Sequence, residues 1–310
     1  MRVIFMGTPD FSVGTLEALV QAGHEVVLAV TQPDKPKGRG GKMQYTPVKE
    51  KALEYDIPVF QPVKVREKSC VEKLDSYKAD VMVVVAFGQI LPREILELTP
   101  YGCINVHASL LPKYRGAAPI QWSIIDGEKV TGITTMYMAK GLDSGDMLLK
   151  AEVEITDEDT FATIHDKMAV TGANLLLDTL DQLEAGTLER IPQDHDAETY
   201  APMITKETGH IDWSKNRQDI INLIRGLNPV PAAYTIYEED VLKIFGAVIS
   251  DVQADGAANG EIVAVVKKGF VVKCGDGCLL ITEVQARGGK RMMTDAYLRG
   301  HAMKEGILLQ

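Results

Sequence analysis

The chain has 310 residues, of which 45% are hydrophobic and 25% are charged, and its formal net charge is −10. This composition is typical of a globular protein with room for two domains. No apolar run approaches the roughly 18 residues that a membrane-spanning helix needs, so we expect no membrane partner. The opening residues MRVIFMGTPDF reach a turn after a few apolar residues, without a cleavage-like site, so we expect no signal peptide.

The cysteines are too few for a disulfide framework and indicate a reducing compartment, so we expect a cytoplasmic protein. They are Cys70, Cys103, Cys274 and Cys278. The last two flank Gly-Asp-Gly, which predicts a hairpin turn between two strands. A two-cysteine metal site without a nearby histidine is the weaker alternative, and we expect no metal ion.

The acidic charge is concentrated in one region. Thirteen acidic residues lie between Glu152 and Glu198 against only Lys167 and Arg190, a local balance of −11 that leaves the rest of the chain near +1. Basic clusters elsewhere can therefore create a positive local field. The net charge does not exclude a nucleic-acid partner.

In the first half, short strand-like runs alternate with helical patterns. The predicted strands cover residues 2–7, 25–31, 80–87 and 103–109, and the predicted helices cover residues 11–21 and 117–126. The run DVMVVVAF is almost continuously apolar, as in a central strand covered on both faces. The alternation predicts an α/β fold with a doubly wound, mostly parallel sheet of Rossmann-like type. The opening turn GTPDFS lacks the pattern GxGxxG, so we expect no dinucleotide cofactor.

The later elements suggest a second domain. Two strands at 133–138 and 147–155 surround the turn GLDSGD, and a long amphipathic helix is predicted at 160–183. The polar segment 187–208 contains two prolines and is typical of a linker. Beyond it, a helix at 219–227 precedes five short strands separated by glycine-rich turns. Such strands predict a small β-barrel, for which the OB fold is the natural candidate.

Asn105, His107 and Asp143 are the candidate catalytic residues. Residues i and i+2 face the same side of a strand, so Asn105 and His107 should emerge together at a strand end, where ligands bind in doubly wound sheets. An imidazole can move a proton, an amide can stabilise an oxyanion, and a nearby carboxylate can orient the imidazole. With no activated serine or cysteine and no metal motif, this set suits attack by a substrate nucleophile on a carbonyl. The alternative is a structural strand-end histidine and a turn-forming aspartate.

Longer motifs carry a family resemblance. NVHASLLPKYRGAAPIQ, followed by GLDSGDM, resembles the signature of the formyltetrahydrofolate-dependent formyltransferases. FMGTPDFS, TQPDKPKGRGGK and IRGLNPVPAAYT resemble, more narrowly, those members that formylate methionine on initiator tRNA. The resemblance covers nearly the whole chain. It implies a catalytic domain at 1–188, a linker at 189–207 and a tRNA-binding OB-like domain at 208–310.

The resemblance also implies an activity and its substrates. The formyl group of 10-formyltetrahydrofolate would pass to the α-amine of methionine on initiator tRNA. Asn105 and His107 would stabilise the oxyanion, while Asp143 would hold His107 and assist proton transfer. Folate would be bound by two short stretches: Phe87, Gly88, Gln89 and Ile90, and Ser109, Leu110, Leu111 and Pro112. We expect a monomer.

Two basic regions are candidate tRNA contacts. The loop from Gln32 to Thr46 carries Lys35, Lys37, Arg39 and Lys42, opposed only by Asp34. A solvated flexible loop is the ordinary interpretation, whereas the resemblance implies that the loop binds the acceptor end, with Arg39 as its main contact. The second region comprises Lys267, Lys268, Arg287, Lys290 and Arg291. With few aromatic residues on its strands, we expect phosphate and shape recognition there rather than base stacking.

Other functions remain open at the level of sequence. The acceptor could be a nucleotide-linked sugar or a purine precursor, the chain could be a non-catalytic tRNA-binding protein, or water could replace the amine in a folate hydrolase. Three segments also depart from the family pattern: NPVPAAY lacks an aromatic residue after Asn-Pro, GRGGK lacks a second adjacent lysine, and Ala139 and Lys140 stand where an acidic residue is common. None of them includes a candidate catalytic residue.

Overall fold

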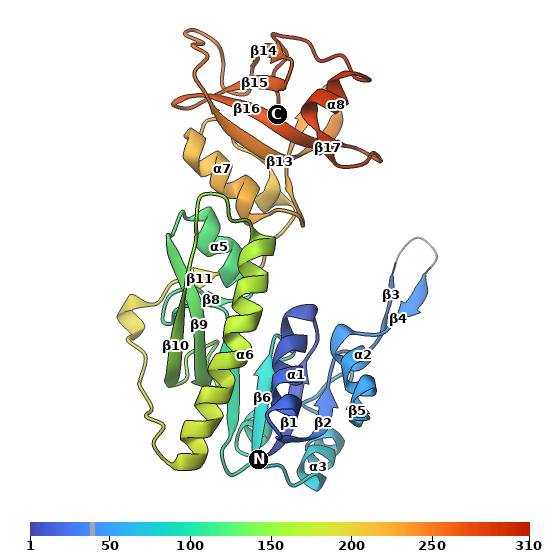
Figure 1. The fold of residues 1–310 in the computed structure, drawn as a ribbon, viewed down its shortest axis with the longest axis vertical. Coiled ribbons are helices and arrows are strands. Elements are labelled where there is room, and N and C mark those ends of the chain that lie inside the picture. Colours follow the sequence, from blue (N-terminus) through green and yellow to red (C-terminus); the bar gives the residue numbers. More distant parts are fainter. Residues whose placement is uncertain (38–40) are drawn as a thin grey trace. The chain divides into compact units, whose positions relative to one another are not determined.

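The computed structural model describes residues 1–37 and 41–310, which form two compact units (Figure 1). The first unit comprises Met1–Gly116, Val130–Glu154 and His165–Ala201, and the second comprises Ala117–Lys129, Ile155–Ile164 and Pro202–Gln310. In the described part of the chain, no helix is both long and apolar enough to cross a membrane.

The first unit is built on a seven-stranded sheet with the order β10-β9-β7-β6-β1-β2-β5. Its strands are β1 (Arg2–Gly7), β2 (Glu25–Val30), β5 (Val59–Phe60), β6 (Val81–Val85), β7 (Cys103–His107), β9 (Val130–Tyr137) and β10 (Met147–Glu154). The five strands from β5 to β7 pair in parallel, whereas β9 runs antiparallel to β7 and β10 antiparallel to β9. The predicted mostly parallel, doubly wound sheet is confirmed.

Continuous apolar sequence explains the central strands. All five residues of β6 and all five of β7 are buried, as expected for parallel strands covered on both faces. Burying one large aliphatic side chain stabilises the fold by about 1.5–3 kcal/mol. The polar residues Asn105 and His107 therefore stand in a strand that is otherwise core.

Helices cover this sheet (Figure 1). They are the short 3-10 helix η1 (Asp10–Ser12), α1 (Val13–Gln21), α2 (Pro47–Glu54), α3 (Lys68–Ser76), α4 (Arg93–Leu96) and the part of α6 (Phe161–Ala185) from His165 onward. The hydroxyls of Thr179 in α6 and Thr135 in β9 lie 2.8 Å apart. A Cβ atom at Gly172 would lie 3.0 Å from Val106 Cγ1, so a glycine there lets α6 approach β7 closely.

A two-stranded hairpin follows β2, formed by β3 (Lys35–Lys37) and β4 (Lys42–Gln44), and it projects from the first unit (Figure 1). The start of this hairpin is fixed by polar contacts. Lys49 Nζ lies 2.5 Å from Asp34 Oδ2, and Gln61 Nε2 donates to Asp34 Oδ1 at 2.7 Å. Arg39, the main predicted tRNA contact, lies outside the described residues.

The second unit contains an antiparallel sheet with the order β12-β13-β16-β15-β14, with β17 paired to β16. Its elements are α5 (Pro119–Ile125), η3 (Glu207–Gly209), α7 (Arg217–Gly226), β12 (Ala233–Tyr237), β13 (Asp240–Ser250), β14 (Ile262–Val266), β15 (Gly269–Cys274), β16 (Gly277–Ala286), β17 (Met292–Met293) and α8 (Thr294–Leu298). As predicted, Gly275 and Asp276 form the hairpin turn between β15 and β16.

The last residues of the chain connect the two edge strands of this sheet. Ile236 in β12 and Gln310 exchange backbone hydrogen bonds, and Ile262 in β14 donates to Ile307 O at 2.9 Å. The enclosed core includes Trp213, Ile244, Phe270 and Ile281. Antiparallel strands around one core, with their edges bridged in this way, agree with the predicted small barrel.

Candidate active site

Asn105 and His107 lie at the carboxyl end of β7, between the parallel strand β6 and the antiparallel strand β9. Asn105 is paired with Met136 and His107 with Thr134. Both are almost completely buried, with 9% and 6% of their surfaces exposed. Because they are two residues apart in a strand, their side chains leave the same face of the sheet.

The imidazole of His107 is held at both ring nitrogens. Nε2 lies 3.0 Å from the carbonyl oxygen of Tyr114, which can only accept a hydrogen bond, so Nε2 is the protonated nitrogen. Nδ1 lies 3.8 Å from Oδ2 of Asp143. In the neutral ring, Nδ1 is therefore the nitrogen that can take up a proton, and the carboxylate beside it would stabilise the resulting charge.

Asp143 comes from the loop between β9 and β10. Its backbone has a φ of +45°, and its Oδ2 accepts a hydrogen bond from Gly116 N at 2.9 Å. The loop is packed closely against β9, since a Cβ atom at Gly145 would lie only 1.8 Å from Tyr137 O. The second glycine of the GLDSGD motif, Gly145, is thus needed for space.

The side-chain amide of Asn105 makes no hydrogen bond to any described residue, whereas those of Gln193 and Gln89 hydrogen-bond through both their oxygen and their nitrogen. Neither amide atom of Asn105 is among the fully buried side-chain atoms that lack a partner, so this end of the side chain is accessible. Its N–H groups are therefore available to a ligand that binds beside His107.

The first predicted folate stretch follows β6. Thr8 Oγ1 and Gln32 Nε2 both donate to Phe87 O, at 3.0 and 3.2 Å. Gln89 accepts from Val65 N at 2.8 Å and donates to Pro62 O at 2.9 Å, so its side chain fixes the loop. The Phe87 ring belongs to the core, whereas the Ile90 side chain is 90% exposed. The surface that this stretch offers is the backbone near Gly88 and the side chain of Ile90.

The second predicted folate stretch follows β7 and is tied to β9 and β10. Thr134 Oγ1 donates to Ser109 O at 2.7 Å and accepts from Leu111 N at 3.1 Å. Lys150 Nζ donates to Leu111 O at 2.6 Å. Ser109 and Leu111 are buried, while Leu110 and Pro112 are partly exposed. The first folate stretch therefore follows the carboxyl end of β6, next to β7, and the second follows the carboxyl end of β7 itself, which carries Asn105 and His107.

The predicted basic residues have different surroundings. Lys35 is exposed at the start of the hairpin, and the backbones of Lys37 and Lys42 pair across it. In the second unit, Lys267, Lys268 and Lys290 are exposed, and Arg287 Nη1 lies 3.6 Å from Asp240 Oδ1. Arg291 is engaged within its own unit: it pairs with Glu283 at 2.7 Å and lies over the ring of Phe245.

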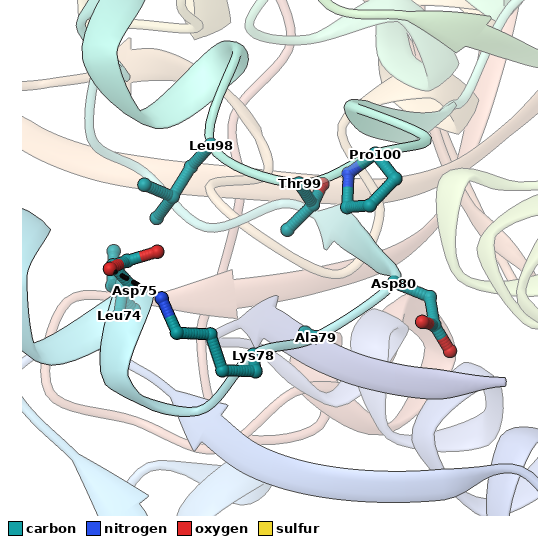
Figure 2. A pocket seen from close by; sticks show the side chains of 8 residues that line it. All are labelled: Leu74, Asp75, Lys78, Ala79, Asp80, Leu98, Thr99 and Pro100. Atoms are coloured by element: carbon teal, nitrogen blue, oxygen red, sulfur yellow. Dashed lines mark hydrogen bonds and ion pairs between the residues drawn. The ribbon is translucent and has the colours of Figure 1, made fainter.

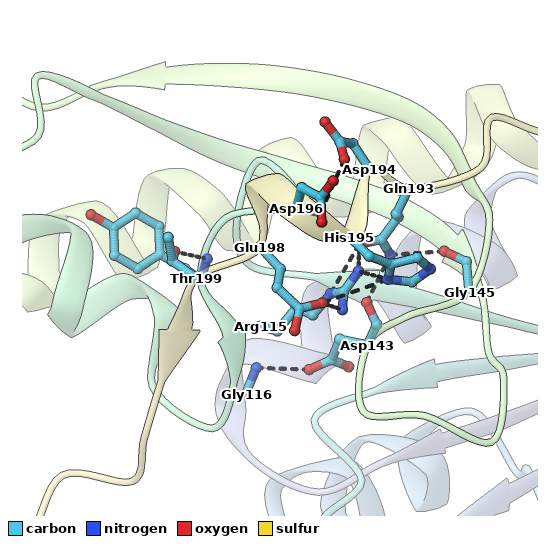
Figure 3. Close-up of polar contacts among 11 residues, drawn as sticks. Arg115, Gly116, Asp143, Gly145, Gln193, Asp194, His195, Asp196, Glu198 and Thr199 are labelled. Carbon is cyan, nitrogen blue, oxygen red and sulfur yellow. Dashed lines mark hydrogen bonds and ion pairs between the residues drawn. The ribbon is translucent and has the colours of Figure 1, made fainter.

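Residues that the sequence analysis did not select surround Asp143 (Figure 3). The Gln193 side chain donates to Asp143 O at 2.7 Å and to Gly145 O at 2.8 Å. The buried guanidinium of Arg115 donates to Gln193 Oε1 and pairs with Glu198. No spacing in the sequence indicates these contacts, because Arg115 and Gln193 are separated by 78 positions.

A surface pocket elsewhere in the first unit has a volume of about 280 Å³ (Figure 2). It is lined by residues that include Asp75, Lys78 and Asp80, and Asp80 immediately precedes β6. The pocket therefore lies at the edge where the parallel strands begin, whereas Asn105 and His107 lie at the edge where they end. None of the predicted site residues lines it.

Comparisons with known proteins agree on one family. The family model described as formyl transferase matches residues 1–180, and that described as formyl transferase, C-terminal domain, matches residues 203–302. A methionyl-tRNA formyltransferase of Agathobacter rectalis is 54% identical over 99% of this chain and 98% of its own length. The methionyl-tRNA formyltransferase of Acetivibrio thermocellus is 51% identical over 100% of this chain and 99% of its own length.

Solved structures share the fold. WlaRD, a sugar 3N-formyl transferase crystallised with dTDP and 5-N-formyl-THF, has a TM-score of 0.67 at 18% identity and covers 94% of this chain and 99% of its own. HypX from Aquifex aeolicus in complex with tetrahydrofolic acid has a TM-score of 0.63 at 17% identity, over 96% of this chain and 47% of its own. Taken with the family models and the close relatives, these likenesses leave one conclusion: the chain belongs to the formyl transferase family.

Proposed function

We propose that the chain transfers the formyl group of 10-formyltetrahydrofolate to the α-amine of methionine esterified to initiator tRNA. Relatives about half identical to it over their whole length are methionyl-tRNA formyltransferases. The observation that carries the proposal is the group at the carboxyl edge of the sheet: buried Asn105, with an unengaged amide, buried His107, and the partly buried carboxylate of Asp143. The cytoplasm, where bacterial translation takes place, is the compartment that this function implies.

The reaction requires two bonds to change at one carbon. The amine nitrogen attacks the formyl carbon and forms the new C–N bond, and the carbonyl oxygen becomes an oxyanion. The C–N bond to the folate nitrogen then breaks, and the formyl group stays on the amine. One proton must leave the attacking amine and one must reach the departing folate nitrogen, so the exchange balances.

The three residues have distinct roles in this proposal. The Asn105 amide donates a hydrogen bond to the oxyanion, because its N–H groups have no other partner among the described residues. His107 accepts the amine's proton at Nδ1, since Nε2 is committed to Tyr114 O. The charged ring then helps Asn105 to stabilise the oxyanion, and the proton passes on to the leaving nitrogen. Asp143 stabilises the positively charged ring from 3.8 Å.

Recognition of both substrates extends this site. The folate is proposed to lie along Phe87–Ile90 and Ser109–Pro112, whose backbones are fixed by neighbouring side chains. The tRNA is proposed to contact Lys35, Lys37, Arg39, Lys42, Lys267, Lys268, Arg287, Lys290 and Arg291, although Arg291 would first have to leave Glu283. We also propose a catalytic domain at 1–188, a linker at 189–207 and a tRNA-binding domain at 208–310. We propose that the protein is a monomer.

The test is single-turnover formylation with 10-formyltetrahydrofolate and three acceptors: methionyl initiator tRNA, uncharged initiator tRNA and free methionine. Formyl product on the charged tRNA alone is the expected result. Equal product on free methionine would contradict recognition of the tRNA. Formate release at the same rate without any acceptor would identify a hydrolase instead.

A further inference from the structure

The segment from Ile191 to Ala201 packs against the loops that carry or follow the candidate catalytic residues. Its polar sequence alone predicts a linker. The short strand β11 (Tyr200–Ala201) pairs in parallel with β8 (Arg115–Gly116), and Ile191 pairs with Met147 at the start of β10. The whole segment belongs to the first unit.

Gln193 is the residue of this segment that reaches the Asp143 loop. It is only 7% exposed, and its single amide nitrogen donates to both Asp143 O and Gly145 O. Its Oε1 accepts from Nε and Nη2 of Arg115, at 3.0 and 2.7 Å. A guanidinium can only donate, so the amide has one possible orientation, with its nitrogen toward the loop.

Arg115 is itself held by the same segment (Figure 3). Its guanidinium pairs with the Glu198 carboxylate and lies 3.2 Å from Nδ1 of His195. Only 5% of the Arg115 surface is exposed. Its buried charge takes its counter-ion and its hydrogen-bond acceptors from side chains between positions 193 and 198. The oxygen of Gln193 is therefore bound by a buried guanidinium that has its own partners.

The segment also fixes the other partner of His107. Thr199 Oγ1 accepts from Tyr114 N at 2.8 Å, and Thr199 O accepts from Arg115 N at 2.9 Å. The Tyr114 carbonyl, which bonds His107 Nε2, is thereby fixed by its neighbours. One stretch of chain thus fixes both the carbonyl and the carboxylate that face the imidazole.

We propose that Gln193 is a positioning residue for Asp143, which keeps the Asp143 carboxylate beside His107 by binding the backbone on both sides of Ser144. This inference rests on the proposed function, in which Asp143 acts through His107. Asp143 adopts a φ of +45°, a left-handed conformation that costs aspartate less than most residues but is still less favourable than a negative φ, so added hydrogen bonds help to hold the loop. Gln193 supplies two such hydrogen bonds, to carbonyl oxygens two residues apart in this loop.

The first test compares Gln193→Met, which keeps the length of the side chain but loses its polar atoms, with Gln193→Glu. The glutamate still accepts from Arg115 but cannot donate to the two carbonyls. We expect both variants to lower the single-turnover formylation rate about 10- to 100-fold, with KM for either substrate changed less than threefold. The control is Glu189→Ala, an exposed position just before the segment, which should keep the wild-type rate. A wild-type rate in Gln193→Glu would overturn the proposal.

The second test asks whether Gln193 acts through Asp143. In the background of Asp143→Asn, adding Gln193→Met should lower the rate by less than about twofold, because a residue that acts only through another loses its effect when that residue is disabled. Losses that multiply in full would contradict positioning. Melting temperatures of all variants identify any that fail to fold.

The third measurement needs no substrate and so separates this inference from the proposed function. Hydrogen exchange of the Gly116 amide, which donates to Asp143 Oδ2 at 2.9 Å, should become at least tenfold faster in Gln193→Met and stay unchanged in Glu189→Ala. Unchanged exchange in Gln193→Met overturns the positioning role. Faster exchange in a protein whose wild type formylates no tRNA supports the positioning role and overturns the proposed function.

Discussion

Substituting Gly145 by alanine should move the Asp143 loop by a distance that the structure defines. The new Cβ would lie 1.8 Å from Tyr137 O, and real Cβ contacts essentially never fall below 3.0 Å. The loop must therefore retreat from β9 by at least about 1.2 Å. Gly145 does not have a positive φ, so alanine is disfavoured by space alone.

A displacement of about 1 Å at a reacting group can cost about 100-fold in rate, which corresponds to about 2.7 kcal/mol of activation free energy. We therefore expect Gly145→Ala to lower the single-turnover formylation rate about 100-fold. Overpacking should also lower the free energy of unfolding by about 1–3 kcal/mol.

Rapid-quench formylation of methionyl initiator tRNA, with urea unfolding in parallel, measures both effects. The matched control is Gly14→Ala in α1, where an added Cβ would meet no atom within 4 Å. We expect that variant to keep the wild-type rate. If Gly145→Ala formylates within threefold of the wild type, the placement of the loop against Tyr137 has no bearing on the chemistry, and the reasoning fails.

Arg39→Ala should weaken the use of tRNA and reduce its salt dependence, because it removes a phosphate contact, while the exposed Lys78→Ala should change neither. Unchanged tRNA kinetics with impaired folate use would contradict the role given to this loop. Burial raises the pKa of the Cys103 thiol to about 12, so it should not react with a thiol reagent at pH 8 until the chain unfolds. In the unfolded chain the thiol ionises near pH 8.5, about its ordinary pKa. The free energy of unfolding should therefore decrease between about pH 8.5 and pH 12, and Cys103→Ala should lack this part of the pH dependence. Rapid labelling of the native protein would be the opposite result.

Much of the fold could be predicted because it depends on local patterns. The parallel strands are buried on both faces, so β1, β2 and β6 are visible as nearly continuous apolar runs, and β7 as an apolar run that Asn105 and His107 interrupt. The placement of Asn105 and His107 followed from the two-residue period of a strand. The family resemblance, carried by motifs around these residues, is confirmed by the family models and the close relatives.

Other elements were missed for physical reasons. The helices α2 and α3 have only eight and nine residues, with few apolar positions, so their periodicity is weak. The strands β8 and β11 have two residues each, too few to form an alternating pattern. The contact between Arg115 and Gln193 joins distant parts of the chain, and only the folded structure brings them together.

The most direct test of the central claim compares the wild type and His107→Ala in single-turnover formylation of methionyl initiator tRNA, with folate binding measured separately. Losing a positioned acid–base group typically costs about 100-fold or more. We expect at least that loss in the formylation rate, with folate binding and melting temperature retained. A formylation rate near that of the wild type would contradict the assignment of this site to the chemistry.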